Sequence, residues 1–421
     1  MKYDLSREEA QRLDEQDTLA PYRRQFIHAE PDLIYLLGNS LGRLPQATAH
    51  RLNDVVNGEW GQRLIRGWME GWMELPHRVG DKIGSLLGAR PGEVIVADST
   101  SVNFYKAVLA ALQLTPGRSK VVTDDLNFPS DLYILQGAVR ASGGNHQLHV
   151  VPSPDGIHGP LAALEEAIDE ETALVALSHT VFKSAYVYDM AAVNQIARRA
   201  GTHVVWDLSH SAGAVGVDLN AAQAEFAAGC TYKYLNGGPG APAFLYVRRD
   251  LQESVLNPIP GWMGQQEPFE FGLEYEAAGG LRRFLTGTPS ILSLSAIEPG
   301  IDLLLEAGMQ QVIEKSRRQT AYLQQLWQEY LQPLGFKLRS PLQPDRRGSH
   351  LALAHEEGLR ISLALQERNV LLDFRRPDNL RLSVAPLYTS YSALYDAVQQ
   401  MRAVVAERLY EKYAHEAPAV T

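Results

Sequence analysis

Six short apolar runs alternate with segments of helical periodicity between about residues 90 and 250, and this alternation is what most narrows the folds open to the chain. It is typical of a mainly parallel sheet covered by helices on both faces, because each parallel strand needs a crossover before the next one. The predicted helices lie near Val102–Leu112, Leu161–Ile168 and Met190–Ala197. The predicted strands are Glu93–Ala97, Lys120–Thr123, Gln147–Val151, Ala173–Ser178, His203–Asp207 and Ala243–Val247.

A change of pattern at Ser290 predicts a second unit, as expected for 421 residues, a length that exceeds one ordinary core. Long helical stretches, interrupted by Pro299 and Gly308, precede a mixture of strands and a last helix. We therefore predict an N-terminal segment at residues 1–60 that wraps the other parts, a large α/β domain at 61–290 and a smaller α+β domain at 291–421. The predicted elements of the smaller domain are helices Ile291–Ala307, Gln310–Leu331 and Ser390–Tyr413, and strands Phe336–Arg339, His350–Ala354, Val370–Phe374 and Leu380–Val384.

Lys233 and Asp207 are the two residues whose combination indicates a chemistry. Lys233 lies between two tyrosines ahead of a Gly-Gly-Pro-Gly turn, and Asp207 ends an apolar strand earlier in the chain. A lysine amine condenses with an aldehyde to form a Schiff base, and a carboxylate can keep a pyridinium nitrogen protonated. Alone, most lysines are solvated charges, and an aspartate after a strand is usually a turn or cap residue. Their joint order and spacing predict pyridoxal 5'-phosphate as the cofactor.

Polar residues after other predicted strands supply candidate contacts. Asp98-Ser99-Thr100-Ser101 stands between a strand and a helix, where hydroxyl and free N–H groups favour an anion, although the same residue types form ordinary helix caps. In the loop after the next strand, Phe128 could stack on a planar ring, with Ser130 and Asp131 beside it. His210 could bind a phosphate or orient the nearby aspartate. We expect these groups together, because ligands of open α/β sheets bind beyond the carboxyl ends of the strands.

Arg381 and several tryptophans are candidates for substrate recognition. Arg381 alternates with apolar residues along a predicted strand, so its guanidinium faces away from them, toward solvent or toward a carboxylate that it could bind bidentately. Four of the six tryptophans lie outside both the predicted strands and the predicted helices, which points to an aromatic substrate pocket. They are Trp60, Trp68, Trp72 and Trp262.

The overall charge and the motifs that are lacking argue against other classes of function. A net charge of −10 without a long basic block argues against nucleic-acid or anionic-membrane partners. The single cysteine, Cys230, cannot form an internal disulfide, and no signal-like or membrane-spanning apolar run occurs, so we expect a cytoplasmic enzyme. No paired-cysteine or His-Glu-x-x-His motif suggests a metal site, and a Ser-His-Asp hydrolase is not supported, because Asp207-Leu208-Ser209-His210 is too compact to span a triad.

Because of four sequence motifs and their order, the chain closely resembles the kynureninase family, and the resemblance runs nearly from end to end. These motifs are Gly38-Asn39-Ser40-Leu41-Gly42, Phe128-Pro129-Ser130-Asp131, Trp206-Asp207-Leu208-Ser209-His210-Ser211-Ala212-Gly213 and Tyr232-Lys233-Tyr234-Leu235-Asn236-Gly237-Gly238-Pro239-Gly240. The aspartate and the lysine are shared with the wider class V aminotransferase relatives, whereas the first and last stretches are far more specific to this family.

The resemblance implies a fold-type I pyridoxal-phosphate enzyme with a seven-stranded, mainly parallel sheet and a smaller α+β domain. It further implies a homodimer with shared active sites that hydrolyses L-kynurenine to anthranilate and L-alanine in tryptophan catabolism, a pathway linked to NAD biosynthesis. Lys233 would hold the cofactor covalently, Asp207 would pair with the pyridine nitrogen, and Tyr232 would assist proton transfer.

The remaining site residues follow from the same resemblance. Thr288, where animal members typically carry asparagine, points to the bacterial type, which favours kynurenine over its 3-hydroxy derivative. The implied cofactor contacts are Thr100, Ser101, Phe128, Ser130, Asp131, His210 and Tyr232, with Trp262 and Thr288 supplied by the neighbouring subunit. The implied substrate contacts are Arg381, Asn39, Ser40 and Trp68, with Trp72 as an alternative to Trp68.

Three other functions remain open on the sequence. A cysteine desulfurase or selenocysteine lyase shares the aspartate and the lysine, but a desulfurase needs a mobile cysteine, and Cys230 lies in a probable strand end just before Lys233. An aminotransferase would convert an added keto acid. A non-catalytic protein would bind the cofactor without turnover.

Overall fold

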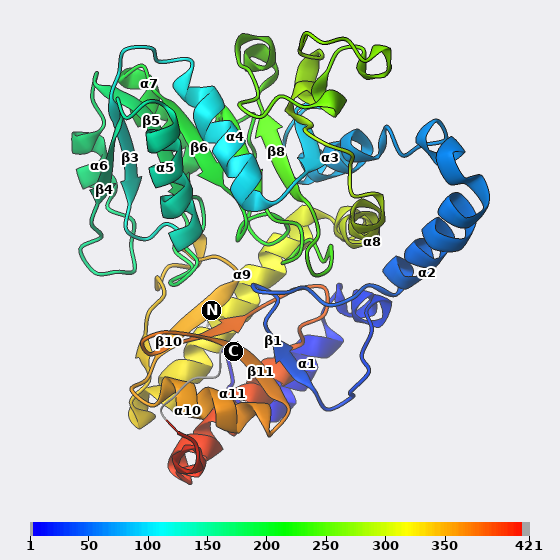
Figure 1. The fold of residues 1–421 in the computed structure, drawn as a ribbon. Helices are drawn as coiled ribbons and strands as arrows, with labels where there is room; N and C mark the ends of the chain where they lie inside the picture. The colour runs from blue at the N-terminus through cyan, green and yellow to red at the C-terminus, as the bar shows by residue number, and fades with distance from the viewer. Residues whose placement is uncertain (1–2, 415–421) are drawn as a thin grey trace.

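The computed structural model describes residues 3–414, so the outermost ends of the predicted N-terminal segment and of the smaller domain lie outside the described part. Its larger sheet has seven strands in the order β2-β8-β7-β6-β5-β3-β4 (Figure 1). Neighbouring strands pair in parallel except around β8, which is antiparallel to β2 and β7. The prediction of a mainly parallel seven-stranded sheet is therefore confirmed. The strands are β2 (Val94–Ala97), β3 (Lys120–Asp124), β4 (Gln147–Val151), β5 (Thr172–Ser178), β6 (His203–Asp207), β7 (Phe226–Gly229) and β8 (Ala243–Val247).

Alternate residues of these strands bury two separate apolar layers, as the period of a strand requires. Val205 and Leu245 pack into one layer with helices α4 (Thr100–Leu112) and α5 (Pro129–Ala141). Val204, Trp206 and Phe244 pack into the other layer. Helices α3 (Leu75–Leu86), α6 (Leu161–Ala167), α7 (Met190–Arg199) and α8 (Ile291–Ala307) contribute to that second layer.

A five-stranded sheet forms the smaller unit, in the order β1-β11-β12-β10-β9. Its first strand comes from the N-terminal segment, where few strand signals are visible in the sequence, and pairs in parallel with β11. Helix α1 (Arg7–Glu15) packs on α11 of the same unit, whereas α2 (Gln46–Asp54) packs on α8 of the larger one (Figure 1). The strands are β1 (Ile34–Leu36), β9 (Lys337–Leu338), β10 (His350–Ala354), β11 (Val370–Arg375) and β12 (Asn379–Ser383); the helices include α9 (Met309–Leu326), α10 (Gly358–Gln366) and α11 (Tyr391–Ala406).

Two local expectations differ from the structure. Helix α8 continues through Pro299, although a proline removes one helical hydrogen bond. The helix packs against α2 and α3 with a nearly continuous buried face, so tertiary packing outweighs the local cost. Strand β7 is absent from the six predicted strands because Phe226-Ala227-Ala228-Gly229 is short and contains two alanines and a glycine, which have low strand propensity.

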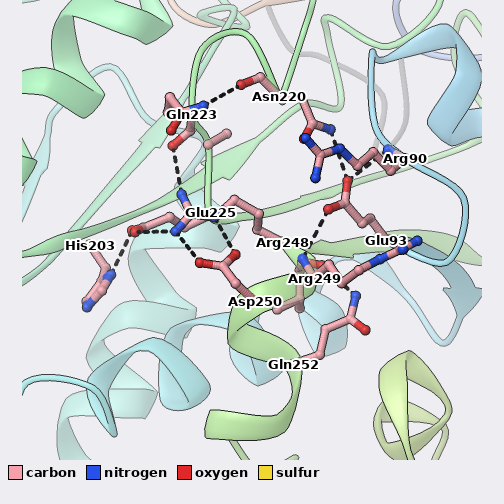
Figure 2. Close-up of polar contacts among 12 residues, drawn as sticks. Arg90, Glu93, His203, Asn220, Gln223, Glu225, Arg248, Arg249, Asp250 and Gln252 are labelled. Atoms are coloured by element: carbon pink, nitrogen blue, oxygen red, sulfur yellow. Dashed lines mark hydrogen bonds and ion pairs between the residues drawn. The ribbon is translucent and has the colours of Figure 1, made fainter.

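Hydrogen bonds and ion pairs of charged side chains lie at the end of the larger sheet where β6 and β7 begin (Figure 2). Glu93, which is fully buried before β2, accepts hydrogen bonds from the backbone N–H groups of Arg90 and Arg249 at 2.8 and 3.1 Å. Glu225, just before β7, contacts His203 at 2.7 Å and Arg248 at 3.5 Å. These contacts join the starts of β2, β6 and β7 to the end of the antiparallel β8, so they fix the strands at this end.

Within residues 3–414, no helix is both long enough and apolar enough to cross a bilayer.

Candidate functional site

A cavity of 190 Å³ lies between the two units, at the carboxyl ends of the large-sheet strands. This is where ligands of open α/β sheets bind. Its walls contain the residues after β2, β3, β6 and β7, the segment after β1, and side chains from β11 and β12. Of the predicted site residues, it brings together Asn39, Ser40, Thr100, Ser101, Phe128, Ser130, Asp131, Asp207, His210, Tyr232, Lys233 and Arg381.

Lys233 and Asp207 open into the same cavity, as a shared cofactor requires. The Lys233 Nζ lies 6.0 Å from the ring centre of Phe128 and 5.9 Å from that of Tyr232. Asp207 ends β6, and its Oδ1 accepts a hydrogen bond from the Ser209 N–H at 2.8 Å, which fixes the carboxylate. An amine between two aromatic rings and a fixed carboxylate match the reactive groups that pyridoxal phosphate needs.

Asp131 stands beside Asp207, whose charge contributes to the electrostatics of the Asp131 carboxyl group. Burial, followed by the negative charge of Asp207, raises the pKa of Asp131 well above its usual value. Burial and the neighbouring negative charge therefore both favour the protonated form of Asp131. Its Oδ2 is buried without a hydrogen-bond partner in the described chain, which leaves an unused polar atom at the cavity.

His210 is a neutral partner of Lys233. The Lys233 Nζ lies 2.9 Å from the His210 Nε2. Burial, followed by the positive charges of Lys233 and Arg381, lowers the pKa of His210 well below its usual value. The neutral imidazole therefore accepts a hydrogen bond from the amine and holds it in place. Its Nδ1 is buried without a partner among the described residues.

Two helices begin at one corner of the cavity and create a site for an anion. Ser99 caps α4 by accepting a hydrogen bond from the Val102 N–H, which frees Thr100 and Ser101 to line the cavity. The Oγ atoms of Ser101 and Ser130, from the first turns of α4 and α5, lie 3.0 Å apart. Free N–H groups and hydroxyls at two helix starts suit the phosphate of the predicted cofactor.

The Gly38–Gly42 segment reaches the cavity between β1 and the lysine loop. Asn39 is fully buried, and neither polar atom of its side chain has a partner in the described chain, although the residue lines the cavity. The Gly42 N–H donates a hydrogen bond to the Tyr232 carbonyl at 2.8 Å. A Cβ on Gly42 would lie 2.3 Å from the Lys233 carbonyl oxygen, so only glycine permits this close approach.

Arg381 extends from β12 into the cavity instead of toward solvent. Its neighbours Leu380 and Leu382 face the core of the smaller unit, as the alternation along the strand predicts. The guanidinium is 1% exposed, contacts Asp373 and donates to the Phe182 carbonyl at 2.6 Å. Burial lowers the pKa of Arg381 to about 10, which leaves the side chain charged at neutral pH. A charged guanidinium, which can donate two parallel hydrogen bonds, suits a substrate carboxylate.

Tyr232 and Cys230 keep their protons at neutral pH. The neighbouring Cys230 thiol, followed by burial, raises the pKa of Tyr232. Burial raises the pKa of Cys230, whose side chain faces the Ser209 carbonyl. A buried thiol in the protonated state is a poor nucleophile, which weighs against a cysteine-dependent desulfurase.

Three predicted site residues lie outside this cavity. Trp262 is 44% exposed and Thr288 is also exposed, so the side chains of both residues are accessible on the surface of the single chain. Trp68 packs edge-to-face on Trp72, with ring centres 5.4 Å apart. The Trp72 Nε1 donates to Glu59 at 2.6 Å. Neither tryptophan of this pair contacts the cavity of its own chain.

Four cavity residues were not identified from the sequence: Ser178, Phe182, Ser209 and Arg375. Ser178 pairs with Asp207 across neighbouring strands, so the strand assignment could have identified it. Phe182 contacts the Phe128 ring edge-to-face at 5.0 Å, a pairing between two loops that no local pattern predicts.

A buried histidine behind Asp207 makes folding sensitive to acid. His179 bonds to the Ser211 Oγ at 2.8 Å, and burial lowers its pKa from 6.5 to about 4. Because the folded pKa is below the unfolded one, this contribution is fully present above pH 6.5 and disappears as the pH falls through about 4. On acidification, we expect the unfolding free energy of His179→Gln to fall by about 3 kcal/mol less than that of the parent. Urea unfolding across this pH range checks it; parallel curves for both proteins would contradict it.

Comparison with protein families matches residues 312–401 to the kynureninase C-terminal domain. The chain is also 41% identical over 392 residues to the kynureninase of Pseudomonas fluorescens, covering 92% of each protein.

Solved structures share the fold at low sequence identity. An apo cysteine desulfurase from Thermococcus onnurineus NA1 matches with a TM-score of 0.80 at 17% identity, covering 91% of this chain and 98% of that one. A C-DES mutant with glycine covalently linked to its PLP cofactor matches with a TM-score of 0.76 at 16% identity, covering 90% and 98%. At such identities these matches support the fold alone. The fold-type I assignment is confirmed.

Proposed function

Because this chain belongs to the kynureninase family, we propose that it hydrolyses L-kynurenine to anthranilate and L-alanine. It is a pyridoxal-phosphate-dependent hydrolase that acts on a carbon–carbon bond in a ketonic substance. The observation that carries the substrate proposal is the cavity itself, because Lys233 and Asp207 line it together with Arg381, the candidate for binding a substrate carboxylate.

The residues of the cavity divide the binding of cofactor and substrate between them. Pyridoxal phosphate, when bound, supplies an aldehyde for the amines and a ring that withdraws electrons from the substrate. Lys233 would bind the aldehyde, Asp207 would hold the proton on the ring nitrogen, and Phe128 would stack on the ring. The two helix starts would hold the phosphate, through Thr100, Ser101 and Ser130. Arg381, with Asn39 and Ser40, would orient the substrate carboxylate.

Two residues move protons in this proposal. Lys233, held by the neutral His210, takes the proton from the substrate α-carbon. Tyr232 keeps its phenolic proton and is the candidate donor to the β-carbon, once water has added to the γ-carbonyl and the bond between the β and γ carbons breaks.

The direct test offers the purified protein, loaded with pyridoxal phosphate, L-kynurenine and 3-hydroxykynurenine separately. We expect anthranilate and L-alanine from the first and a slower reaction with the second, because the resemblance is to the bacterial type. Fluorescence of anthranilate and chromatography of alanine measure the products. Amino-group transfer to an added keto acid without anthranilate release would instead identify an aminotransferase, and cofactor binding without any turnover would identify a non-catalytic protein.

We also propose a homodimer whose subunits share their active sites. The support is an exposed apolar surface on the segment that carries Trp262, where a chain on its own would leave large side chains in water. Light scattering after gel filtration should give twice the chain mass of 46.6 kDa. A monomeric and fully active enzyme would contradict the sharing. The exposed side chains of this segment are Leu256, Trp262, Phe269, Phe271, Leu273 and Tyr275.

A further inference from the structure

Asp373 is a buried carboxylate placed between two arginines. It lies directly opposite Arg381 in the antiparallel pair of β11 and β12. Arg375 is two residues further along β11, so its side chain leaves the same face of the sheet. The intervening Phe374 faces the core of the smaller unit. Strand geometry therefore places both guanidiniums beside one carboxylate.

The contacts confirm this grouping. Asp373 is 2% exposed and forms an ion pair with Arg381. Its Oδ2 also accepts from the Ser40 Oγ at 3.0 Å and lies 3.3 Å from the Arg375 Nε. That Nε is buried and lacks a hydrogen-bond partner within residues 3–414, although Arg375 lines the cavity.

The charge of this group explains why a second arginine is needed. Asp373 alone would neutralise Arg381, and a neutral pair offers little attraction to a substrate carboxylate in a buried site. With Arg375 included, one carboxylate stands between two guanidiniums, which leaves one positive charge. The charges of both arginines also lower the pKa of His210, so both act at the same part of the cavity.

We propose that Arg375 is a second carboxylate-binding residue, which supplies the net positive charge that recognises the α-carboxylate of the substrate, while Asp373 positions both arginines. This inference rests on the proposed function. In this arrangement the Arg375 side chain, which is 41% exposed, contacts the substrate carboxylate. Arg381, which is almost fully buried, forms the base of the same subsite.

The test compares Arg375→Gln, which removes the charge, with Arg375→Lys, which keeps it. L-Alanine, the smallest carboxylate-bearing ligand of the proposed reaction, is titrated into the holoenzyme and followed by cofactor absorbance. We expect Arg375→Gln to raise its dissociation constant roughly ten- to hundredfold, the loss expected for a charge-assisted hydrogen bond. Arg375→Lys should restore most of the affinity. For L-kynurenine, KM should rise while kcat is nearly unchanged.

Two controls separate the subsite from a general disturbance. Arg368→Gln removes the same charge from an exposed position of the smaller unit and should leave L-alanine binding unchanged. The decarboxylated amine of the substrate should bind equally well to the parent and to Arg375→Gln. Unchanged L-alanine binding in Arg375→Gln would overturn the proposal. So would an equal loss of affinity for the decarboxylated amine. Loss of the cofactor from this variant would also overturn it, because Arg375 would then be a phosphate contact. Because alanine binding needs no hydrolysis, a failure to cleave kynurenine would count against the proposed function and not against this inference.

Discussion

Lys233→Ala is expected to lower the turnover of L-kynurenine by at least about 10³-fold, because one change removes both the covalent attachment of the cofactor and the proton acceptor at the α-carbon. The helix starts and Phe128 remain in this variant, so the cofactor should still bind non-covalently. Borohydride reduction followed by denaturation distinguishes the two states. The parent should retain the cofactor after this treatment, and the variant should release it.

Lys183 offers a matched control for this change. Its side chain is exposed next to the cavity, with the Nζ 5.7 Å from the Phe182 ring, and it is not among the residues that line the cavity. Lys183→Ala should keep both turnover and covalent attachment. If Lys233→Ala retained the parent rate, the assignment of the covalent lysine would be wrong.

Asp207→Asn is expected to reduce kcat by about 10²- to 10³-fold, the usual loss when one preorganised electrostatic partner is removed. An amide has nearly the same shape and can still accept the hydrogen bond from the Ser209 N–H, but it carries no charge to hold a proton on the ring nitrogen. Steady-state kinetics on the fully loaded enzyme measures the loss. Asp207→Glu, which restores the charge, should recover part of the rate.

Asp131→Asn is the informative control, because burial and the charge of Asp207 already favour the protonated form of this neighbouring carboxyl group. Exchanging a carboxyl group that favours its protonated form for a neutral amide changes the charge of the cavity little, so its effect on kcat should be much smaller than that of Asp207→Asn. Equal losses in the two variants would show that the charge of Asp207 is not what matters. The comparison thus tests whether the two adjacent carboxyl groups contribute differently to the rate.

The part of the site carried by the large sheet could be predicted because it depends on local order. Asp207 and Lys233 follow strands that are adjacent in the sheet, and the carboxyl ends of such strands meet at one edge. Arg381 could be placed on the correct face of its strand by the alternation of apolar neighbours. In each case, a short stretch of sequence contains the pattern that determines the position.

Other features depend on contacts between distant segments, which one local pattern does not reveal. Arg375 is adjacent to the exposed Arg376 near a turn, and only its pairing across β11 and β12 places it beside Asp373. Strand β1 is three residues long and is stabilised by β11, which lies more than 300 residues further along the chain. The predicted roles of Trp262, Thr288 and Trp68 stay predictions, because they concern a second chain or a loop away from the cavity.

The close approach at Gly42 couples two parts of the enzyme mechanically. Strand β1 is part of the smaller sheet, whereas Gly42 is hydrogen-bonded to the loop that carries Lys233. The Ser40 Oγ donates to Asp373 of the smaller sheet, so any rotation of that sheet against the larger one would act on the short step from Ser40 to Gly42. Because Asn39 and Ser40 are predicted substrate contacts, a shift of the smaller sheet that moved them would also displace the loop of Lys233.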